Sequence, residues 1–400
     1  MRFTSIDTQA VHAGERPPRP QYKPVTTPIY TSVGYLYEDS QDLDAVLGGE
    51  RQGYVYPRYG SPTVAAFERA VAVLENAGDA VAFASGMAAV HAALLGAGAR
   101  AGVSVVSASD VYGASYVLQD ALLRTMGVQA RFVDVADLDE LTRAVEEVKP
   151  VAVFCEIISN PLMKVADVPA TAAIAHEHGA ALIVDSTFAT PCLYRPLEHG
   201  ADYVVHSATK YIGGHGDLMA GVVAASEERS GDLRQRQKLL GANLGPFEAW
   251  LGLRGLKTLP LRMRKQCENA QIVAQWLSEQ PHLGRINYPG LARHPQYALA
   301  RSLFADRGSG AMMSFELEGA GREEVFRFMD ALELVLPATT LGDVQSLVLY
   351  PARSSHRQVP AEVREALGIG DGLVRLSVGI EDPRDIIADL SHAMEAVSGD

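Results

Sequence analysis

The chain has 400 residues, of which 48% are apolar and 21% are charged, a composition typical of a globular protein with two or three domains. Its formal net charge of −13 opposes binding to nucleic-acid backbones or anionic membranes, and no apolar run reaches the length of a membrane span. The three scattered cysteines suit neither a disulfide framework nor a zinc cluster, and the N-terminus lacks the apolar core of a signal peptide, so we expect a cytoplasmic protein with reduced thiols and no metal.

Residues 1–55 form the first segment of the predicted organisation. This segment is rich in proline, threonine and tyrosine and has no sustained periodicity, as in PPRPQYKPVTTPIYTSVGYLY (17–37). Clusters of such residues favour turns and extended backbone over helices and strands. We therefore expect an extended arm that is held by packing against something else rather than by a core of its own.

Residues 56–245 are predicted to form a large α/β domain. Ser61 and Pro62 favour the start of a helix, whose apolar spacing continues to an expected end at Gly78. Short apolar runs then alternate with helical stretches, which is typical of a mostly parallel sheet covered by helices on both faces. The runs are AVAFAS (80–85), VSVVSAS (103–109), ARFVDV (130–135), VAVFCEI (151–157), ALIVDS (181–186), DYVVHS (202–207) and AGVVAAS (220–226).

Residues 246–400 are predicted to form a smaller α+β domain. A long helical region, FEAWLGLRGLKTLPLRMRKQCENAQIVAQWLSEQ (247–280), contains Pro260, which should kink or break it. The strand-like stretches AMMSFELE (311–318), SLVLY (346–350) and LVRLSVGIE (373–381) follow, together with a helix near 323–332 and a closing helix after Pro383.

Ligands of parallel sheets bind beyond the carboxyl ends of the strands, so the residues that end each apolar run deserve inspection. Ser85 and Gly86 stand at a strand-to-helix junction and suit a phosphate or another anion, although an ordinary N-cap turn is the better explanation when they are taken alone. Asp185 ends a buried run, where a carboxylate needs a cation, a helix N-terminus or a protonated ring nitrogen as its partner.

The stretch HSATKYIGGHGD (206–217) contains the most informative lysine of the chain. Ser207 and Thr209 share a face if the backbone is extended, and both hydroxyls can donate to a phosphate. Lys210 follows them, and a lysine amine with a lowered pKa forms Schiff bases with aldehydes, whereas an exposed lysine at a loop start would do nothing. A phosphate seat, Asp185 for a pyridine nitrogen and Lys210 for an aldehyde together predict a pyridoxal 5′-phosphate (PLP) site, with Tyr112 stacked on the ring.

These stretches resemble the Cys/Met-metabolism, or transsulfuration, family of PLP enzymes, which includes cystathionine γ-synthase, cystathionine and methionine lyases and O-acylhomoserine sulfhydrylases. The resemblance runs in the family's order over nearly the whole chain and implies fold type I, the aspartate-aminotransferase-like fold, with the PLP-binding large domain at 56–245. The motifs that carry it are YVYPRYGSPT, FASGMAA, DVYGAS, SNPLMKVADV, IVDSTFATP, HSATKYIGGHGD, RGLKTLPLRM and RLSVGIED.

The resemblance also implies a role for individual residues and a homotetramer built as a dimer of dimers with shared active sites. Lys210 would form the Schiff base and move protons, and Tyr112 would stack on the ring and act as an acid–base partner. The remaining implied roles are phosphate binding by Ser85, Gly86, Met87, Ser207 and Thr209, ring binding by Asp185 and Asn160, contact with a neighbouring subunit's phosphate by Tyr56 and Arg58, and substrate binding by Arg375, Tyr56 and Thr340.

Three departures from the family's pattern leave the substrate open: EIISNP (156–161) before and around Asn160, Ala114 where methionine-lyase-like members tend to have cysteine, and Gln345 where many cystathionine-handling members have glutamate. We expect α,γ-elimination, which cleaves the C–S bond of methionine, cystathionine or homocysteine to give 2-oxobutanoate, ammonia and a thiol. The alternatives are γ-replacement on an O-acylated homoserine and, less favoured, a regulatory protein that keeps the fold.

Overall fold

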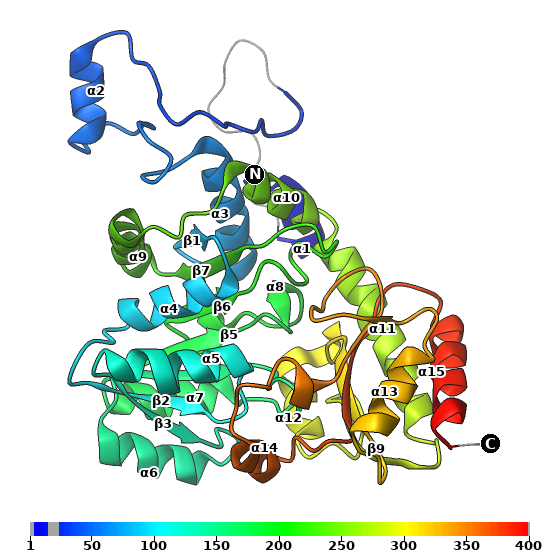
Figure 1. The fold of residues 1–400 in the computed structure, drawn as a ribbon. Helices are drawn as coiled ribbons and strands as arrows, with labels where there is room; N and C mark the ends of the chain where they lie inside the picture. The colour runs from blue at the N-terminus through cyan, green and yellow to red at the C-terminus, as the bar shows by residue number, and fades with distance from the viewer. Residues whose placement is uncertain (1–3, 15–23, 399–400) are drawn as a thin grey trace.

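A computed structural model describes residues 4–14 and 24–398, and Figure 1 shows two β-sheets that lie side by side, each packed with helices. Residues 15–23, which belong to the predicted arm, lie outside the described residues. The larger sheet has seven strands in the order β1-β7-β6-β5-β4-β2-β3. Its strands are β1 Asp79–Phe83, β2 Ser104–Ala108, β3 Gln129–Val133, β4 Ala152–Glu156, β5 Ala181–Asp185, β6 Tyr203–His206 and β7 Gly221–Ala225.

All seven predicted apolar runs become strands of this sheet, which confirms the α/β class. Strands β2 to β6 pair in parallel, whereas β7 pairs antiparallel with both β6 and β1. The strands β4, β5 and β6 are adjacent, so their carboxyl ends meet at one edge of the sheet. The chain passes from β6 to β7 through the loop that contains Lys210, with no helix in between.

Helices cover both faces of the large sheet (Figure 1). Helices α4 and α9 contact one another, α6 contacts α7, and α3 packs on β1 and against α10. The elements up to residue 256 are α1 Ile6–His12, α2 Ser40–Leu47, α3 Pro62–Glu75, α4 Gly86–Gly96, α5 Gly113–Val117, η1 Leu118–Leu123, α6 Leu138–Val148, α7 Val168–Glu177, α8 Thr190–Leu193, η2 Pro196–His199, α9 Glu227–Leu240 and α10 Pro246–Leu256.

Helix α3 shows where a sequence signal is right and where it is not. The helix begins at Pro62 as expected, although the Ser61 side chain makes no capping hydrogen bond. Its end is not at Gly78: Asn76 adopts the left-handed conformation, with φ of 54°, and its backbone N–H donates to the carbonyls of Ala72 and Val73. Asparagine tolerates this conformation better than most residues, so it ends the helix two residues early.

The smaller sheet has five strands in the order β10-β11-β12-β9-β8 and is mostly antiparallel. Strands β9, β11 and β12 and helices α13 and α15 fall on the stretches predicted for them, whereas β8, β10, α12 and α14 were not predicted. The elements are α11 Leu259–Leu277, β8 Leu283–Asn287, α12 Tyr297–Phe304, η3 Ala305–Arg307, β9 Met312–Leu317, α13 Arg322–Asp330, β10 Leu336–Pro337, β11 Leu347–Leu349, η4 Pro351–Arg353, α14 Ala361–Leu367, β12 Leu373–Ser377 and α15 Pro383–Ser398.

Pro260 does not kink a continuous helix. The region divides at Lys257 and Thr258, and Pro260 lies in the first turn of α11, where its missing N–H has no helical acceptor to lose. Helix α11 contacts strands β8 and β9 of the smaller sheet, and it also contacts helix α8, which lies between β5 and β6 in the sequence. It therefore connects the two halves of the molecule, a position that Figure 1 makes visible.

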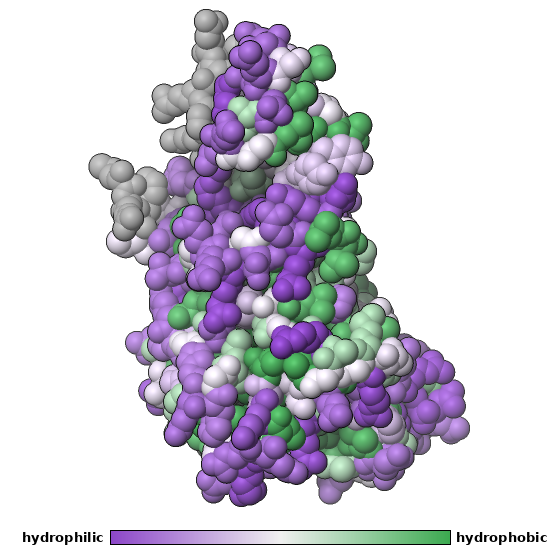
Figure 2. All heavy atoms as spheres, turned by 90° about the vertical axis from the view of Figure 1, so that its left-hand side faces the viewer, coloured by the Kyte–Doolittle hydropathy of each residue, from purple (hydrophilic) through white to green (hydrophobic). Residues whose placement is uncertain are grey.

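The part of the arm around helix α2 projects from the rest of the chain at the top of Figure 1, whereas helix α1 packs on α3 and α11. Helix α2 has no buried residue, and the arm exposes the large apolar side chains of Val33, Leu36 and Leu47. Figure 2 shows hydrophobic side chains on this upper part of the surface among hydrophilic ones. Among all the helices of the described residues, none is both long enough and apolar enough to cross a membrane.

Candidate active site

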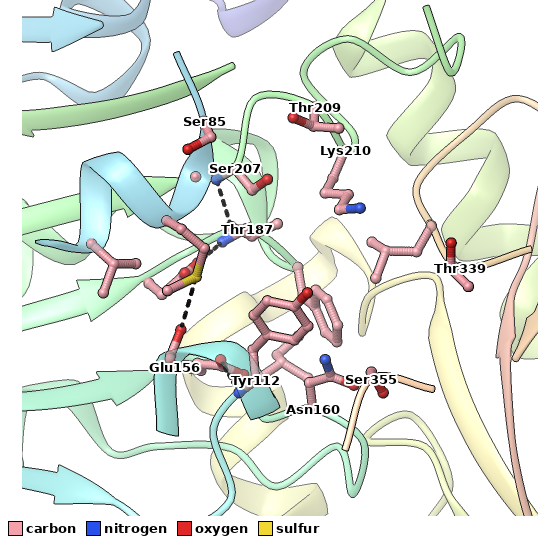
Figure 3. A pocket seen from close by; sticks show the side chains of 18 of the residues that line it. Ser85, Tyr112, Glu156, Asn160, Thr187, Ser207, Thr209, Lys210, Thr339 and Ser355 are labelled. Atoms are coloured by element: carbon pink, nitrogen blue, oxygen red, sulfur yellow. Dashed lines mark hydrogen bonds between the residues drawn. The ribbon is translucent and has the colours of Figure 1, made fainter. Parts of the chain in front are cut away.

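A cavity of ≈ 220 Å³ opens where the carboxyl ends of the central strands face the smaller sheet. Figure 3 shows Lys210 and Tyr112 extending into it from opposite sides. Most of the residues predicted for the site line this cavity, although they come from segments far apart in the sequence. They are Ser85, Gly86, Met87, Tyr112, Asn160, Asp185, Ser207, Thr209, Lys210 and Arg375.

One corner of the cavity combines the start of α4 with the segment after β6. Ser85 is the N-cap of α4, and its hydroxyl accepts a hydrogen bond from the Ala88 N–H at 3.1 Å. A Cβ on Gly86 would lie 2.8 Å from Ser207, so only glycine lets these two segments touch. The free N–H groups of the first helical turn and the Ser207 hydroxyl thus surround a place that suits a phosphate.

Thr209 reaches this corner by a route that the sequence did not indicate. The residues from Ala208 onward form turns, so Ser207 and Thr209 are not aligned by an extended strand. The Thr209 hydroxyl donates to the Ala220 carbonyl at 3.2 Å and accepts from the Ala220 N–H at 2.9 Å. This pair of bonds ties the lysine-bearing loop to the start of the strand that follows it.

The Lys210 amine is largely removed from water and has one hydroxyl partner. Its Nζ donates to the Thr340 Oγ1 at 2.9 Å, a contact that joins the two halves of the molecule. Burial, and then the nearby Arg375 cation, lower the pKa of Lys210 from 10.5 to about 8. A substantial fraction of the amine is therefore neutral, and hence nucleophilic, near physiological pH.

This pKa predicts how fast the chain without cofactor captures an aldehyde. With a pKa of about 8, roughly a tenth of the amine is neutral at about pH 7 and most of it at about pH 9, so the capture rate should rise up to about tenfold across this interval. Stopped-flow absorbance after mixing with PLP measures this rate at each pH. A rate that keeps rising to about pH 10.5, as for an exposed lysine, would contradict the lowered pKa.

Arg375 is a buried cation whose hydrogen bonds are incomplete. Its side chain is 2% exposed, and its guanidinium donates to the Asn160 Oδ1 at 3.0 Å and to the Thr340 carbonyl at 3.3 Å. Its Nε has no partner, and burial lowers the pKa of the group to about 10. Because no carboxylate of the described residues forms an ion pair with it, this cation is suited to the carboxylate of a ligand.

Two carboxylates lie side by side at the ends of β4 and β5. Glu156 and Asp185 are direct partners in the sheet register, and both line the cavity. Asp185 accepts from the Thr187 N–H at 2.9 Å, and Glu156 accepts from the Tyr112 N–H at 2.7 Å. Burial raises the pKa of both, and for Glu156 the Asp185 charge adds to the effect. A nearby cation would stabilise the charged forms of Glu156 and Asp185, and the protonated ring nitrogen of PLP would supply one.

Glu156 was not singled out from the sequence. It opens the stretch EIISNP, which was treated only as a departure from the family's pattern. A carboxylate at the end of an apolar run was the signal that identified Asp185, and the same signal is present at Glu156. The structure gives Glu156 a positioning role, because its carboxylate accepts the backbone N–H of Tyr112 and so fixes the place from which the Tyr112 ring extends.

Other expected residues lie elsewhere. Tyr56 and Arg58 do not line the cavity of their own chain: Tyr56 is 46% exposed, and the Arg58 guanidinium donates to the Lys238 carbonyl. Thr340 touches the Lys210 amine, while its neighbours Thr339 and Leu341 line the cavity. Ala114 and Gln345 are absent from the lining, and Gln345 is exposed to solvent.

Three histidines and one cysteine that could have been functional have structural contacts instead. His206 forms a buried pair with Glu75, with 2.6 Å between Nε2 and Oε1, and His215 is bonded to the Gly213 carbonyl. His176 pairs with Asp202, and among residues 4–14 and 24–398 no group of three or more His, Cys, Asp or Glu side chains is placed to hold a metal. Cys155 is fully buried in β4 as an apolar filler.

Comparison with known proteins gives a consistent result. The model of a family described as Cys/Met metabolism PLP-dependent enzymes matches residues 7–395. The chain is 41% identical to the L-methionine gamma-lyase of Pseudomonas putida over 99% of this chain and 98% of the relative. It is 40% identical to the O-succinylhomoserine sulfhydrylase of Pseudomonas aeruginosa over 98% of this chain and 96% of the relative. A solved cystathionine gamma synthase from Xanthomonas oryzae pv. oryzae, in complex with cystathionine, aligns with a TM-score of 0.93 and 37% identity over 100% of both chains.

Proposed function

Because the chain belongs to the Cys/Met-metabolism family of PLP-dependent enzymes, we propose that it is a carbon–sulfur lyase that carries out α,γ-elimination. Its substrate in this proposal is methionine, cystathionine or homocysteine, and its products are 2-oxobutanoate, ammonia and a thiol. The observation that carries the proposal is the contact between Lys210 and Thr340, whose carbonyl is in turn bonded to Arg375. One residue thereby links the amine that reacts to the cation that binds a carboxylate.

The residues present fit the cofactor. Ser85, Gly86, Met87, Ser207 and Thr209 would hold its phosphate, Asp185 and Asn160 would bind its ring, Tyr112 would stack on the ring, and Lys210 would be its covalent attachment. When bound, PLP withdraws electrons from the Cα of an amino-acid substrate. Three apolar residues, Val90, Ile158 and Phe188, also line this cavity.

The chain's own groups then account for the proton transfers. Arg375 binds the substrate carboxylate. The neutral Lys210 amine removes the Cα proton, hands this proton on and, once neutral again, removes a Cβ proton. The Cγ–S bond breaks with its electron pair on sulfur, and the Tyr112 hydroxyl protonates the leaving thiolate. One of the two protons taken from carbon then goes to Cγ and the other restores the Tyr112 hydroxyl. Addition of water and loss of ammonia give the 2-oxo acid, so atoms and charge balance. The apolar side chains of Phe188, Met219 and Leu341, which also line the cavity, suit an uncharged thioether.

The second candidate is γ-replacement, in which a thiol adds at Cγ instead of water acting on the intermediate. The similarity to a sulfhydrylase, at 40% identity, nearly equals the similarity to a methionine lyase, at 41%. A third reading, a regulatory protein that keeps the fold, is disfavoured by the intact set of Lys210, Asp185 and Arg375. Such a protein would not develop Schiff-base absorbance when PLP is added.

One experiment separates elimination from replacement. The holoenzyme is incubated with methionine, cystathionine, homocysteine and O-acetylhomoserine, each with and without an added thiol, and the products are identified by mass spectrometry. Elimination predicts 2-oxobutanoate and ammonia without a thiol. Strict dependence on an acylated homoserine together with a thiol would assign the chain to replacement.

Replacing Arg375 with lysine should weaken substrate binding far more than the chemical step. Lysine keeps a positive charge but cannot form the two-pronged contact of a guanidinium with a carboxylate. The loss of about 1.5 to 3 kcal/mol for a charged hydrogen bond corresponds to a rise of about 10- to 100-fold in KM. Steady-state kinetics with the preferred substrate measures this change, and Arg264→Lys, at an exposed site on α11, is the control. An unchanged KM in Arg375→Lys would remove Arg375 from the substrate site.

We propose that the assembly is a homotetramer with shared sites, in which Tyr56 and Arg58 reach the cofactor phosphate of a neighbouring subunit. Two observations support this: neither residue lines the cavity of its own chain, and the arm beside them exposes apolar side chains that another subunit could cover (Figure 2). Mixing inactive Lys210→Ala and Arg58→Ala variants should restore partial activity, because some hybrid sites would contain both native residues. Monomers in analytical ultracentrifugation, or no complementation, would contradict the shared site.

We further propose a cytoplasmic location. The three cysteines, Cys155, Cys192 and Cys267, are all unpaired, as expected for a reducing compartment. Subcellular fractionation with an antibody against the chain tests this assignment.

A further inference from the structure

One face of helix α11 carries three buried polar side chains that reach the active-site segments from behind. Arg262, Gln266 and Asn269 follow one another at spacings of four and three residues, which places them in a row along the helix. They are 5%, 0% and 0% exposed, respectively. Each donates to backbone carbonyls of other segments, and the Arg262 Nε also donates to the Thr258 Oγ1 at the start of α11. We call this row the α11 donor row.

Arg262 binds the turn that carries the lysine. Its guanidinium donates to the Tyr211 carbonyl at 2.7 Å and to the Ile212 carbonyl at 3.3 Å, the two residues that directly follow Lys210. It also donates to the Gly255 carbonyl at 2.9 Å. Gly214 has φ of +70°, and a Cβ there would collide with the Arg262 guanidinium, so the loop is shaped to admit this side chain.

The other two members bind the segments of Thr340 and Arg375. The Gln266 Nε2 donates to the Asp343 carbonyl at 2.7 Å and to the Val378 carbonyl at 3.2 Å. The Asn269 Nδ2 donates to the Gly379 carbonyl at 3.0 Å and to the Glu381 carbonyl at 2.7 Å. Asp343 follows Thr340 by three residues, and Val378 follows Arg375 by three. The donor row therefore touches all three segments that carry the amine, its hydroxyl partner and the carboxylate-binding cation.

The α11 donor row is expected to lower the stability of the fold compared with an apolar core. The Gln266 Oε1 and the Asn269 Oδ1 are buried without a partner in the described chain, and Arg262 forms no ion pair with a carboxylate there. Buried polar groups that are incompletely satisfied lower stability, and apolar side chains of similar size often serve a core better. What the polar groups provide is direction, because each donor fixes a particular carbonyl.

We propose that Arg262, Gln266 and Asn269 are positioning residues that set where Lys210, Thr340 and Arg375 stand relative to one another. The roles of Lys210 and Arg375 in this inference rest on the proposed function. Helix α11 acts as a common template: each active-site segment is bonded to it, so the distance between amine and guanidinium is defined through one rigid element. None of the three residues touches the cavity itself.

Local hydrogen exchange in the full-length chain without cofactor tests the template directly. The variants Arg262→Met, Gln266→Met and Asn269→Leu are compared with Arg264→Met, which changes an exposed arginine on the same helix. Arg262→Met should speed exchange at least about tenfold in the peptide 208–214 alone, and Asn269→Leu in 378–382 alone. Gln266→Met should affect 342–346 and 378–382, while Arg264→Met changes none of them.

Kinetics of the holoenzyme provide a second, independent readout. Arg262→Met should lower PLP retention and kcat at least about tenfold with little change in KM, whereas Asn269→Leu should mainly raise KM. Arg262→Lys should recover part of the loss, because an ammonium group can reach one of the two carbonyls, and it replaces Arg262→Met in every measurement if the methionine variant does not fold. If borohydride trapping found the cofactor on another lysine, the role proposed for Lys210 would be wrong. The exchange pattern would still show whether helix α11 positions the three segments.

Two results would overturn the proposal. The first is exchange that rises equally in all three peptides together with a lower melting temperature, which is the signature of general destabilisation. The second is kinetics in which all three variants change kcat by one common factor and KM by one common factor, so that no variant acts mainly on kcat and none mainly on KM.

Discussion

Replacing Lys210 with alanine is expected to lower kcat by at least about 10³-fold, the largest effect of any single substitution in this chain. In the proposed function the amine has two tasks, since it would attach the cofactor and then move protons at Cα and Cβ of the substrate. Its lowered pKa of about 8 suits both tasks, because a neutral amine attacks an aldehyde and accepts a proton. No other described lysine lines the cavity. Steady-state turnover with the preferred substrate measures the loss.

Two controls make this result specific. Lys265→Ala removes an exposed lysine of α11 and should leave turnover unchanged. Adding a small primary amine to Lys210→Ala should restore part of the activity, because the amine can take over the proton transfers. Borohydride reduction of the native enzyme, followed by peptide mapping, should place the pyridoxyl group on Lys210. Wild-type turnover in Lys210→Ala, or an adduct on a different lysine, would disprove the assignment.

Replacing Asp185 with asparagine should lower kcat by about 10²- to 10³-fold while leaving the shape of the site intact. Asparagine is nearly isosteric and can still accept the Thr187 N–H bond that Asp185 accepts at 2.9 Å. It lacks the negative charge that keeps a pyridine nitrogen protonated, so the electron-withdrawing power of the ring falls. Turnover and the equilibrium constant for PLP binding measure the effect, and Asp134→Asn, at a more exposed ion pair with Lys164, is the control.

The same substitution should have the opposite effect on the chain without cofactor. Burial raises the pKa of Asp185 above the usual value of an aspartate, so the buried site favours the protonated form of this group. The stability that goes with this raised pKa is fully present below the unfolded pKa and is lost as the pH rises through the folded pKa, so ionisation of the carboxyl opposes folding. Asp185→Asn should therefore melt no lower than the wild type without PLP and clearly lower with it. A variant that melts lower in both states would contradict this account.

The large sheet was predictable because it is buried on both faces. Each of its strands is a short, nearly continuous apolar run, and such runs are visible in a single sequence. The residues at the ends of β1, β4, β5 and β6 were predicted to form one site, and Ser85, Asn160, Asp185 and Lys210 do line one cavity. The strand order, with the antiparallel β7 inserted between β1 and β6, was not encoded in any local pattern.

The smaller domain was harder to predict because its elements are short and partly exposed. Strand β10 has two residues, both exposed, and β8 has an irregular register with β9. Neither has the alternation of apolar and polar residues that identifies a strand facing a core. Pro260 located the break in the long helical region only approximately. A proline breaks a helix in its middle but begins one in its first turn, and here the break falls at Lys257 and Thr258, just before the helix that contains Pro260.

Partnerships between distant residues were the part of the site that the sequence did not reveal. Glu156 holds the Tyr112 backbone across 44 positions, and the donors of Arg262 reach the lysine turn across about 50. A spacing in the chain says nothing about such contacts, because they depend on how the two sheets dock. The chemistry of the ligand was therefore evident from the strand ends, whereas the scaffold that orients those groups was not.

The Lys210–Thr340 contact spans 130 positions and the Arg375–Asn160 contact spans 215. Contacts of such long range form only after extensive chain closure, so they arise late. A nascent polypeptide that has emerged only as far as β9 contains the reactive lysine but neither Thr340 nor Arg375. We expect such a ribosome-bound chain to acquire no vitamin B6 chromophore, which would make the yellow colour of the enzyme a marker of completed synthesis.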